Sequence, residues 1–94
     1  MAQLLVRHKV KDYTKWKPIF DEHSAKRKAG GSKGGRLFRS TSDPNELVIL
    51  FEWEVVNKAR QFSESWDLRQ AMDRAGVVGR PDLYSLEEIE KFAT

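Results

Sequence analysis

The sequence predicts an α+β fold whose elements follow the order strand, helix, strand, strand, helix, strand. Three patterns carry this prediction. Residues 4–10 alternate between the two faces expected of a strand, whereas apolar residues recur at helical spacing in residues 16–23. Turn-forming residues at 43–46 then separate two further strand-like segments, which predicts a hairpin in the middle of the chain.

The first strand is expected at residues 4–10, and its two faces differ in character. The largely apolar face carries Leu4, Val6, His8 and Val10, and the other face carries Leu5, Arg7 and Lys9. The alternation therefore places His8 among apolar side chains, on the face that we expect to pack into the protein.

The first helix should follow Asp12, a residue type that caps helix N-termini by accepting a backbone hydrogen bond. Pro18 lacks a backbone N–H and is best tolerated in a first turn, so we expect the regular helix to begin near Lys17. The helix should end near Lys28, because three consecutive basic residues suit its carboxyl end and Gly30 and Gly31 permit a left-handed exit.

Residues 30–35 are rich in glycine and are expected to form a flexible connection into the hairpin. The arms of the hairpin are predicted at residues 36–40 and 47–54. In the second arm, one face carries Leu47, Ile49, Phe51 and Trp53, and the other carries Val48 and Leu50. A strand with two apolar faces belongs in a sheet whose faces are both covered.

A second helical region follows the hairpin in two consecutive segments. Asn57 and Ser65 are the expected N-caps of these segments, and Gly76 should end the second of them. A last strand is expected near residues 83–90.

These elements form two half-units joined by the hairpin, which is the topology of a ferredoxin-like βαββαβ sandwich with an antiparallel four-stranded sheet. The first and third strands should lie at the centre of the sheet. Both helical regions then cover one face, and the other face is left with exposed apolar side chains. We therefore expect a homodimer in which a second copy packs sheet to sheet and completes an α/β barrel.

The composition limits the class of protein. A chain of 94 residues is expected to form one domain spanning residues 1–94. Its 39% hydrophobic and 33% charged residues are typical of a soluble globular protein, and no run is long enough to predict a membrane span or a leader, so a cytoplasmic location is expected. The absence of cysteine excludes disulfides and thiol chemistry, and the net charge of +3 is too small to indicate a polybasic arm.

Two histidines are the candidate catalytic residues, because both fall on apolar faces. His8 lies on the buried face of the first strand, and His23 lies on the apolar stripe of the first helix. Either one can act as a general base, or can hydrogen-bond to a bound carbonyl or phenol with help from Tyr13 or an arginine. The alternative is that both are core residues with ordinary partners. A metal site would need a third ligand such as Glu52, and no compact ligand motif indicates one.

Aromatic residues form the candidate ligand pocket. Side chains that can line a pocket for a flat molecule are Trp16, Phe20, Phe51, Trp53 and Tyr13. Core packing explains the same residues without a ligand. No pattern predicts a cofactor site, and the glycine-rich residues 30–35 lack the features of a phosphate-binding loop.

A small βαββαβ unit with an aromatic first helix, and with a strand that ends in Glu52-Trp53 before a helix, resembles the dimeric α/β-barrel superfamily. The antibiotic biosynthesis monooxygenase-like branch is the most similar. The recognisable pieces are residues 4–8, Trp16 with His23, residues 43–45 and residues 65–77. The resemblance implies paired sheets around a cavity, and activities that include cofactor-free oxidation of aromatic compounds, haem degradation and isomerisation of small rings.

Three function classes remain open. The first is a homodimer that binds a small hydrophobic or aromatic molecule, with cofactor-independent monooxygenation or isomerisation as its chemistry. The second is a non-catalytic dimeric module that binds a metabolite or has a stress-related role. The third is single-stranded RNA binding through the open sheet, which the sequence disfavours. The third strand lacks the Lys/Arg-Gly-aromatic opening, and the first strand has Leu, Val and His where a stacking aromatic is expected.

Overall fold

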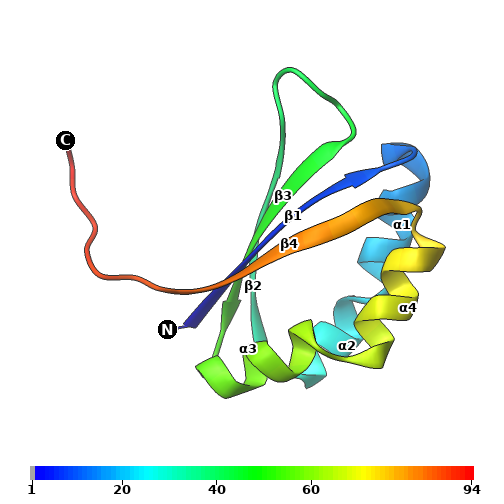
Figure 1. Cartoon of the computed structure of the whole chain (residues 1–94). Helices are drawn as coiled ribbons and strands as arrows, with labels where there is room; N and C mark the ends of the chain where they lie inside the picture. Colours follow the sequence, from blue (N-terminus) through cyan, green and yellow to red (C-terminus); the bar gives the residue numbers. More distant parts are fainter. Residues whose placement is uncertain (1) are drawn as a thin grey trace.

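The computed structural model describes residues 2–94, in which an antiparallel sheet has the strand order β2-β3-β1-β4 (Figure 1). The strands are β1 (Ala2–Val10), β2 (Ser32–Arg39), β3 (Glu46–Trp53) and β4 (Val77–Glu87). The central position of β1 and β3 was predicted from the sequence and is confirmed. Val6 of β1 pairs with Ile49 of β3 and with Leu83 of β4, which fixes the register across the middle of the sheet.

The helices all lie on one face of this sheet (Figure 1). They are α1 (Tyr13–Glu22), α2 (Ser24–Ala29), α3 (Val56–Ser63) and α4 (Trp66–Arg74). The α+β, ferredoxin-like βαββαβ order is therefore confirmed, with each helical connection divided into two short helices. Between this helical layer and the sheet lies the core, formed mainly by the alternate residues of β1 and β3 that face the helices, together with Trp16, Ala59 and Phe62.

The first helix begins earlier than the sequence predicted. It starts at Tyr13 rather than near Lys17, because the Asp12 side chain accepts a hydrogen bond from the Thr14 N–H at 2.9 Å and fixes the first turn there. Pro18 consequently lies inside α1, where it removes one main-chain hydrogen bond. The helical path is also interrupted at His23, which is the C-cap of α1 and the N-cap of α2.

The glycine-rich segment is a strand rather than the predicted flexible connection. β2 begins at Ser32, and an irregularity in its pairing with β3 falls between Ser32 and Gly34. At Gly35 a side chain is excluded, since a Cβ there would come within 2.2 Å of the Leu50 carbonyl oxygen. Glycine is needed here because the backbone of β3 approaches closely.

Two further boundaries differ from the prediction. Val55, not Asn57, is the N-cap of α3, whereas Ser65 does cap α4 as predicted, accepting from the Leu68 N–H at 3.1 Å. Gly76 follows α4 with φ of +79°, as expected for a helix exit. β4 spans Val77–Glu87 rather than 83–90. Its start was not predicted, because the register of β4 against β1 shifts between Arg7 and Lys9 and this shift interrupts the alternation along β4.

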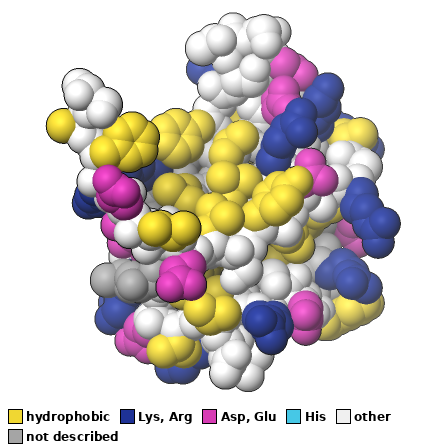
Figure 2. All heavy atoms as spheres, turned by 60° about the vertical axis from the view of Figure 1, so that its left-hand side comes forward, with side chains coloured by type: hydrophobic (Ala, Val, Ile, Leu, Met, Phe, Trp, Pro, Cys, Tyr) yellow, Lys and Arg dark blue, Asp and Glu magenta, His cyan; other side chains and the backbone are white. Residues whose placement is uncertain are grey.

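The sheet face opposite the helices carries exposed apolar side chains, and we call it the open face. Its neighbours in register include Leu5 with Leu50 and Tyr84, and Phe38 with Val48. Phe38 is 48% exposed and Tyr84 is 55% exposed. Figure 2 shows hydrophobic side chains gathered in the middle of this side of the molecule, with charged groups around them.

Charged residues occupy one end of the open face. Arg7 lies between Glu46 at 2.6 Å and Asp82 at 3.6 Å, so both neighbouring strands supply it with a carboxylate. Beyond β4, the C-terminal residues 88–94 extend away from the sheet (Figure 1), and their Ile89 and Phe92 are almost fully exposed. Within residues 2–94, each helix is too short or too polar to cross a lipid bilayer.

Candidate functional site

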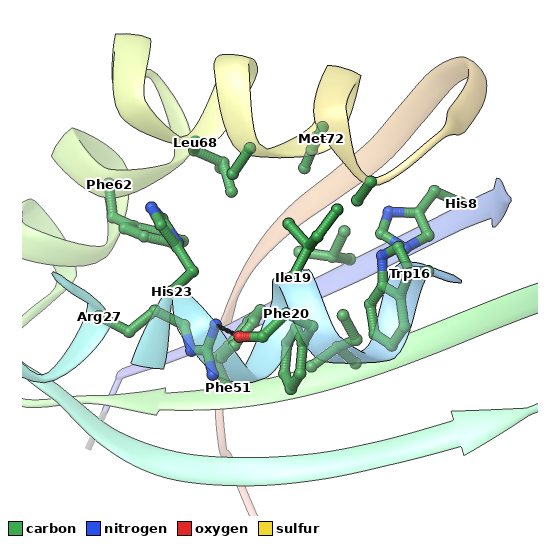
Figure 3. A pocket seen from close by; sticks show the side chains of 14 residues that line it. His8, Trp16, Ile19, Phe20, His23, Arg27, Phe51, Phe62, Leu68 and Met72 are labelled. Atoms are coloured by element: carbon green, nitrogen blue, oxygen red, sulfur yellow. Dashed lines mark hydrogen bonds between the residues drawn. The ribbon is translucent and has the colours of Figure 1, made fainter. Parts of the chain in front are cut away.

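A cavity lies between the sheet and the helical layer, with an internal volume of about 40 Å³. β1 and β3 form its floor, and the helices close it from above (Figure 3). Its lining is almost entirely apolar apart from two histidines and one arginine. The lining residues are Val6, His8, Trp16, Ile19, Phe20, His23, Arg27, Ile49, Phe51, Phe62, Leu68, Ala71, Met72 and Ala75.

His8 reaches this cavity from β1, on the face predicted by the strand alternation. The residue is only 6% exposed, and neither of its ring nitrogens has a hydrogen-bond partner in the part of the chain that the structure describes. Burial lowers the pKa of His8 to about 4, because an apolar environment disfavours the charged imidazolium. His8 is therefore neutral at pH 7, with one nitrogen able to donate and the other able to accept.

His23 lines the cavity from the junction of α1 and α2. It is 8% exposed, and within residues 2–94 its Nε2 has no hydrogen-bond partner. Burial lowers the pKa of His23, and the positive charges of Arg27 and Lys26 lower it further. The two histidines belong to separate walls of one cavity, with Trp16 beside His8 and Phe62 beside His23 (Figure 3).

Aromatic rings form a continuous wall between the histidines. The rings of Trp16 and Phe20 are stacked, with centroids 4.8 Å apart and planes at 20°. The ring centroids of Phe20 and Phe51 are 6.3 Å apart. Those of Phe51 and Phe62 are 6.1 Å apart, with the rings edge to face. Such a wall favours flat, apolar molecules, because ring faces and edges offer dispersion and quadrupole contacts.

Arg27 is a cavity residue that the sequence analysis did not identify. Its guanidinium lies 4.0 Å from the centre of the Phe20 ring, and its Nη1 donates a hydrogen bond to the Phe20 carbonyl oxygen at 2.8 Å. In the sequence, Arg27 belongs to a basic run that is typical of a helix end, and this pattern predicts a role at the helix terminus rather than in a cavity. The helical spacing from His23 to Arg27 was the available signal, since residues four apart share a face.

The structure brings together His8, His23, Trp16, Phe20 and Phe51 of the predicted site residues. Tyr13 and Trp53 lie outside the lining. Tyr13 packs against Trp16, with ring centroids 5.9 Å apart, and Trp53 is completely buried against Phe62. Sequence reasoning also missed Phe62, Leu68 and Met72, whose helical spacing indicates a buried face without saying what that face encloses.

In the described part of the chain, neither histidine belongs to a group of side chains that could bind a metal ion together. Residues 2–94 contain no cluster of three or more His, Cys, Asp or Glu side chains arranged to hold a metal ion. Glu52, the third ligand that a metal site would require, alternates with Phe51 and Trp53 along β3 and so belongs to the open face, away from His8.

Several solved structures share this fold. A candidate antibiotic biosynthesis monooxygenase from Bordetella bronchiseptica is similar with a TM-score of 0.77 and 16% sequence identity, over 95% of this chain and 97% of that one. SnoaB, a cofactor-independent oxygenase from Streptomyces nogalater, is similar with a TM-score of 0.76 and 13% identity, over 99% and 97%. A candidate antibiotic biosynthesis monooxygenase from Caulobacter crescentus CB15 is similar with a TM-score of 0.74 and 18% identity, over 95% of this chain and 90% of that one.

No protein-family model matches the sequence, and no curated protein matches it. The fold and the cavity thus define a ferredoxin-like α+β protein with an apolar, histidine-containing hollow between sheet and helices. Its fold is the one found in the antibiotic biosynthesis monooxygenase-like structures, and the resemblance predicted from the sequence is confirmed at that level.

Proposed function

We propose that this protein binds a small hydrophobic or aromatic molecule in the cavity between sheet and helices, and oxidises it without a cofactor. The observation that carries the proposal is the state of His8, whose two buried ring nitrogens have no partner among residues 2–94. Leaving a buried polar group unpaired costs about 1–3 kcal/mol. A bound phenol or carbonyl would reduce this cost by supplying a hydrogen bond to one of the two nitrogens.

The size of the cavity sets a condition on binding. Its volume of about 40 Å³ admits a few water molecules, whereas an apolar cavity that binds benzene measures about 150 Å³. An aromatic ligand must therefore displace part of the helical layer. Leu68 and Met72 of α4 are the natural point of entry, because they are only partly buried where they close the cavity.

Neutral histidines beside an aromatic wall suit a substrate that becomes reactive on losing a proton. His8 or His23 accepts the proton from a phenol or from an acidic C–H bond, and the resulting anion transfers electrons to O₂. In the oxidation of a CH₂ group to C=O, one oxygen atom stays in the product and the other leaves as water. The substrate supplies all four electrons, so the chemistry requires no further reductant.

The same proton transfer without oxygen would isomerise a small ring compound. Oxygenation is the better-supported reaction, because a structure with this fold is described as a cofactor-independent oxygenase. The likeness to that structure lies in the fold, and the cavity and histidines of this chain support the same chemistry here.

We infer further that the working unit is a homodimer joined through the open face. The apolar side chains of this face, among them Leu5, Leu50, Phe38 and Tyr84, lie on a four-stranded surface that a second copy can match by two-fold symmetry. Such a dimer would complete an α/β barrel and leave each cavity within its own subunit.

One observation favours a second candidate, a binding module without catalysis. A group with a pKa of about 4 is a weak base at pH 7, so His8 accepts a hydrogen bond more readily than it removes a proton. In this candidate the ligand is held by the same cavity and released unchanged.

Two probes test the proposal and separate the candidates. 2-Naphthol, which can hydrogen-bond to His8, should raise the melting temperature more than naphthalene does. Anthrone, whose CH₂ group is acidic, should be oxidised to anthraquinone with uptake of one O₂ per molecule. Binding without oxygen uptake would support the module, and absence of any stabilisation by 2-naphthol would refute ligand binding at this cavity.

Two substitutions at His8 sharpen the test. His8→Gln keeps a hydrogen-bonding side chain but cannot act as a base, so it should retain 2-naphthol binding and lose anthrone oxidation. His8→Leu should lose both. His23→Ala is the parallel variant: unchanged turnover would remove this histidine from the mechanism, provided that circular dichroism shows the variants to be folded.

A further inference from the structure

We propose that Arg27 is the anion-binding residue of the cavity, and that the ligand is a planar hydrophobic anion of which an aromatic carboxylate is the simplest example. This inference rests on the proposed function, because it names the substrate class of the same cavity. It assigns the acidic oxygen of the ligand to the guanidinium, and the ring of the ligand to the aromatic wall.

The first observation is that Arg27 makes no ion pair with any residue from 2 to 94, although neighbouring cations do. Lys26 pairs with Asp67 at 3.5 Å, and Lys17 pairs with Asp21. Arg27 instead donates one hydrogen bond, from Nη1 to the Phe20 carbonyl oxygen at 2.8 Å. A guanidinium carries five N–H donors in a fork that matches two oxygens of a carboxylate.

The second observation is that Arg27 holds its charge in an apolar environment. It is half-buried, and burial lowers its pKa against the smaller opposing effect of Asp21. The rings of Phe20 and Phe51, at 4.0 and 5.8 Å from the guanidinium carbon, stabilise the cation through their faces. These contacts offset part of the cost of desolvating the charge, and an anion beside the guanidinium would offset more of it.

The third observation is the position of Arg27 where several hollows meet. It lines the cavity and an adjoining hollow of about 170 Å³ that runs along β2 and β3, and it also lines a third hollow that includes Glu54. Phe20, Ile49 and Phe51 line both the cavity and the adjoining hollow, so the guanidinium of Arg27 stands at their junction. Figure 3 shows Arg27 beside Phe20 and Phe51 in the cavity. Within the described residues neither the cavity nor the adjoining hollow is lined by an Asp or a Glu, whereas Glu54 belongs to the third hollow. The adjoining hollow adds a second cation, Arg36.

Together these features specify a ligand with two parts. The anionic group binds Arg27 at the junction, where water can still reach it. The flat apolar part extends along Phe20 and Trp16 toward His8, whose neutral ring can hydrogen-bond to a polar atom at the far end. An uncharged aromatic molecule would occupy the wall but leave Arg27 without a partner.

The experiment compares 2-naphthoate with 2-naphthamide, which have the same shape but differ in charge, by isothermal titration calorimetry at pH 7.5. The folded wild-type protein should bind the carboxylate at least tenfold more tightly than the amide. In Arg27→Met the two affinities should become equal, and in Arg27→Lys the preference should be reduced. Arg60→Met, a control at an exposed site on α3, should keep the full preference.

The outcomes separate this inference from the proposed function. Equal binding of both compounds to the wild type, or a preference that survives in Arg27→Met, overturns the role of Arg27 and leaves the cavity as a binding site. Binding of neither compound overturns both proposals. If Arg27→Met does not fold, the comparison of 2-naphthoate with 2-naphthamide on the wild-type protein still tests the preference for an anion, because it needs no variant.

Discussion

His8 and Trp16 meet edge to face, with their ring centroids 5.7 Å apart and their planes at 74°. Trp16 is 2% exposed and lines the cavity with His8, so the imidazole packs against an indole within a largely apolar lining. His8 is thus a polar ring whose two nitrogens have no hydrogen-bond partner among residues 2–94. Residues that reduce stability without a packing reason are typical of functional sites.

Replacing His8 by leucine is expected to stabilise the protein while abolishing ligand binding. The substitution removes two buried nitrogens that have no partner among residues 2–94, and an apolar side chain of similar size avoids their desolvation cost. We expect the free energy of unfolding to rise by about 1 kcal/mol or more, which corresponds to a shift of about 4–8 °C in melting temperature. Thermal denaturation followed by circular dichroism measures it.

Phe51→Leu provides the comparison, because it changes a cavity wall without removing a polar atom and should lower stability in the ordinary way. A loss of stability in His8→Leu would show that the imidazole has a partner that holds it in place.

Stability should fall as the pH decreases from 6.5 to 4. The folded-state pKa of His8 is about 4 against 6.5 for the unfolded chain, so in this window the unfolded state takes up a proton that the folded state excludes. Stability from this group is complete above pH 6.5 and is lost progressively down to pH 4, by about 3 kcal/mol. Urea denaturation at a series of pH values measures the loss.

His8→Leu is the reference for this titration, since the carboxylates titrate equally in both proteins. The difference in stability between the two should grow in favour of the variant as the pH falls. A constant difference from pH 7 to pH 4 would mean that His8 protonates normally in the folded state.

The open face should hold two copies of the chain together. Light scattering over a concentration series should give twice the chain mass of 10.9 kDa. Leu5→Glu places a charge between Leu50 and Tyr84 at the middle of this face and should halve the mass, because an unpaired charge cannot be buried there.

Gln70→Glu on the exposed surface of α4 adds the same charge and should leave the mass unchanged. A well-folded wild-type protein that stays monomeric at high concentration would eliminate the barrel and leave the open face for another partner.

Ser65 should control how firmly α4 closes the cavity. Its hydroxyl accepts from the Leu68 N–H at 3.1 Å, and α4 supplies Leu68 and Met72 to the cavity wall. Ser65→Ala is expected to cost about 1 kcal/mol and to speed amide hydrogen exchange in α4 above all. Ser63→Ala, which removes a hydroxyl that only donates to the Arg60 carbonyl oxygen, is the matched control. Equal exchange in the two variants would contradict the capping role.

The sequence was sufficient for the architecture because the relevant signals are local. The alternation in residues 4–10 and 47–53 identified both central strands and placed His8 on the buried face, as the structure confirms. Asp12, Ser65 and Gly76 marked helix ends through hydrogen bonds or backbone angles that depend on neighbours in sequence. The start of β4 was not predicted, because the register between β4 and β1 shifts there. The residues of β4 on either side of this shift do not follow one simple alternation.

The cavity could be only partly predicted, because it depends on contacts between distant elements. From the sequence, Arg27 is expected to be a cation at a helix end. Only the packing of its guanidinium over Phe20 and Phe51 in the folded protein places it at the cavity. The alternation along β3 places Trp53 and Phe51 on the same face, yet of these two only Phe51 lines the cavity. Sequence periodicity identifies a buried face but not the space that the face leaves empty.

The division of the helical layer has a consequence for folding kinetics. Within residues 2–94 the longest helix has 10 residues, and isolated helices shorter than about 12–15 residues are marginal in water. The helices must therefore form on a sheet that is already pairing, and β1 pairs with β3 across some forty intervening residues. Slow closure of these long loops, rather than helix formation, is expected to limit the rate at which the chain reaches its native state.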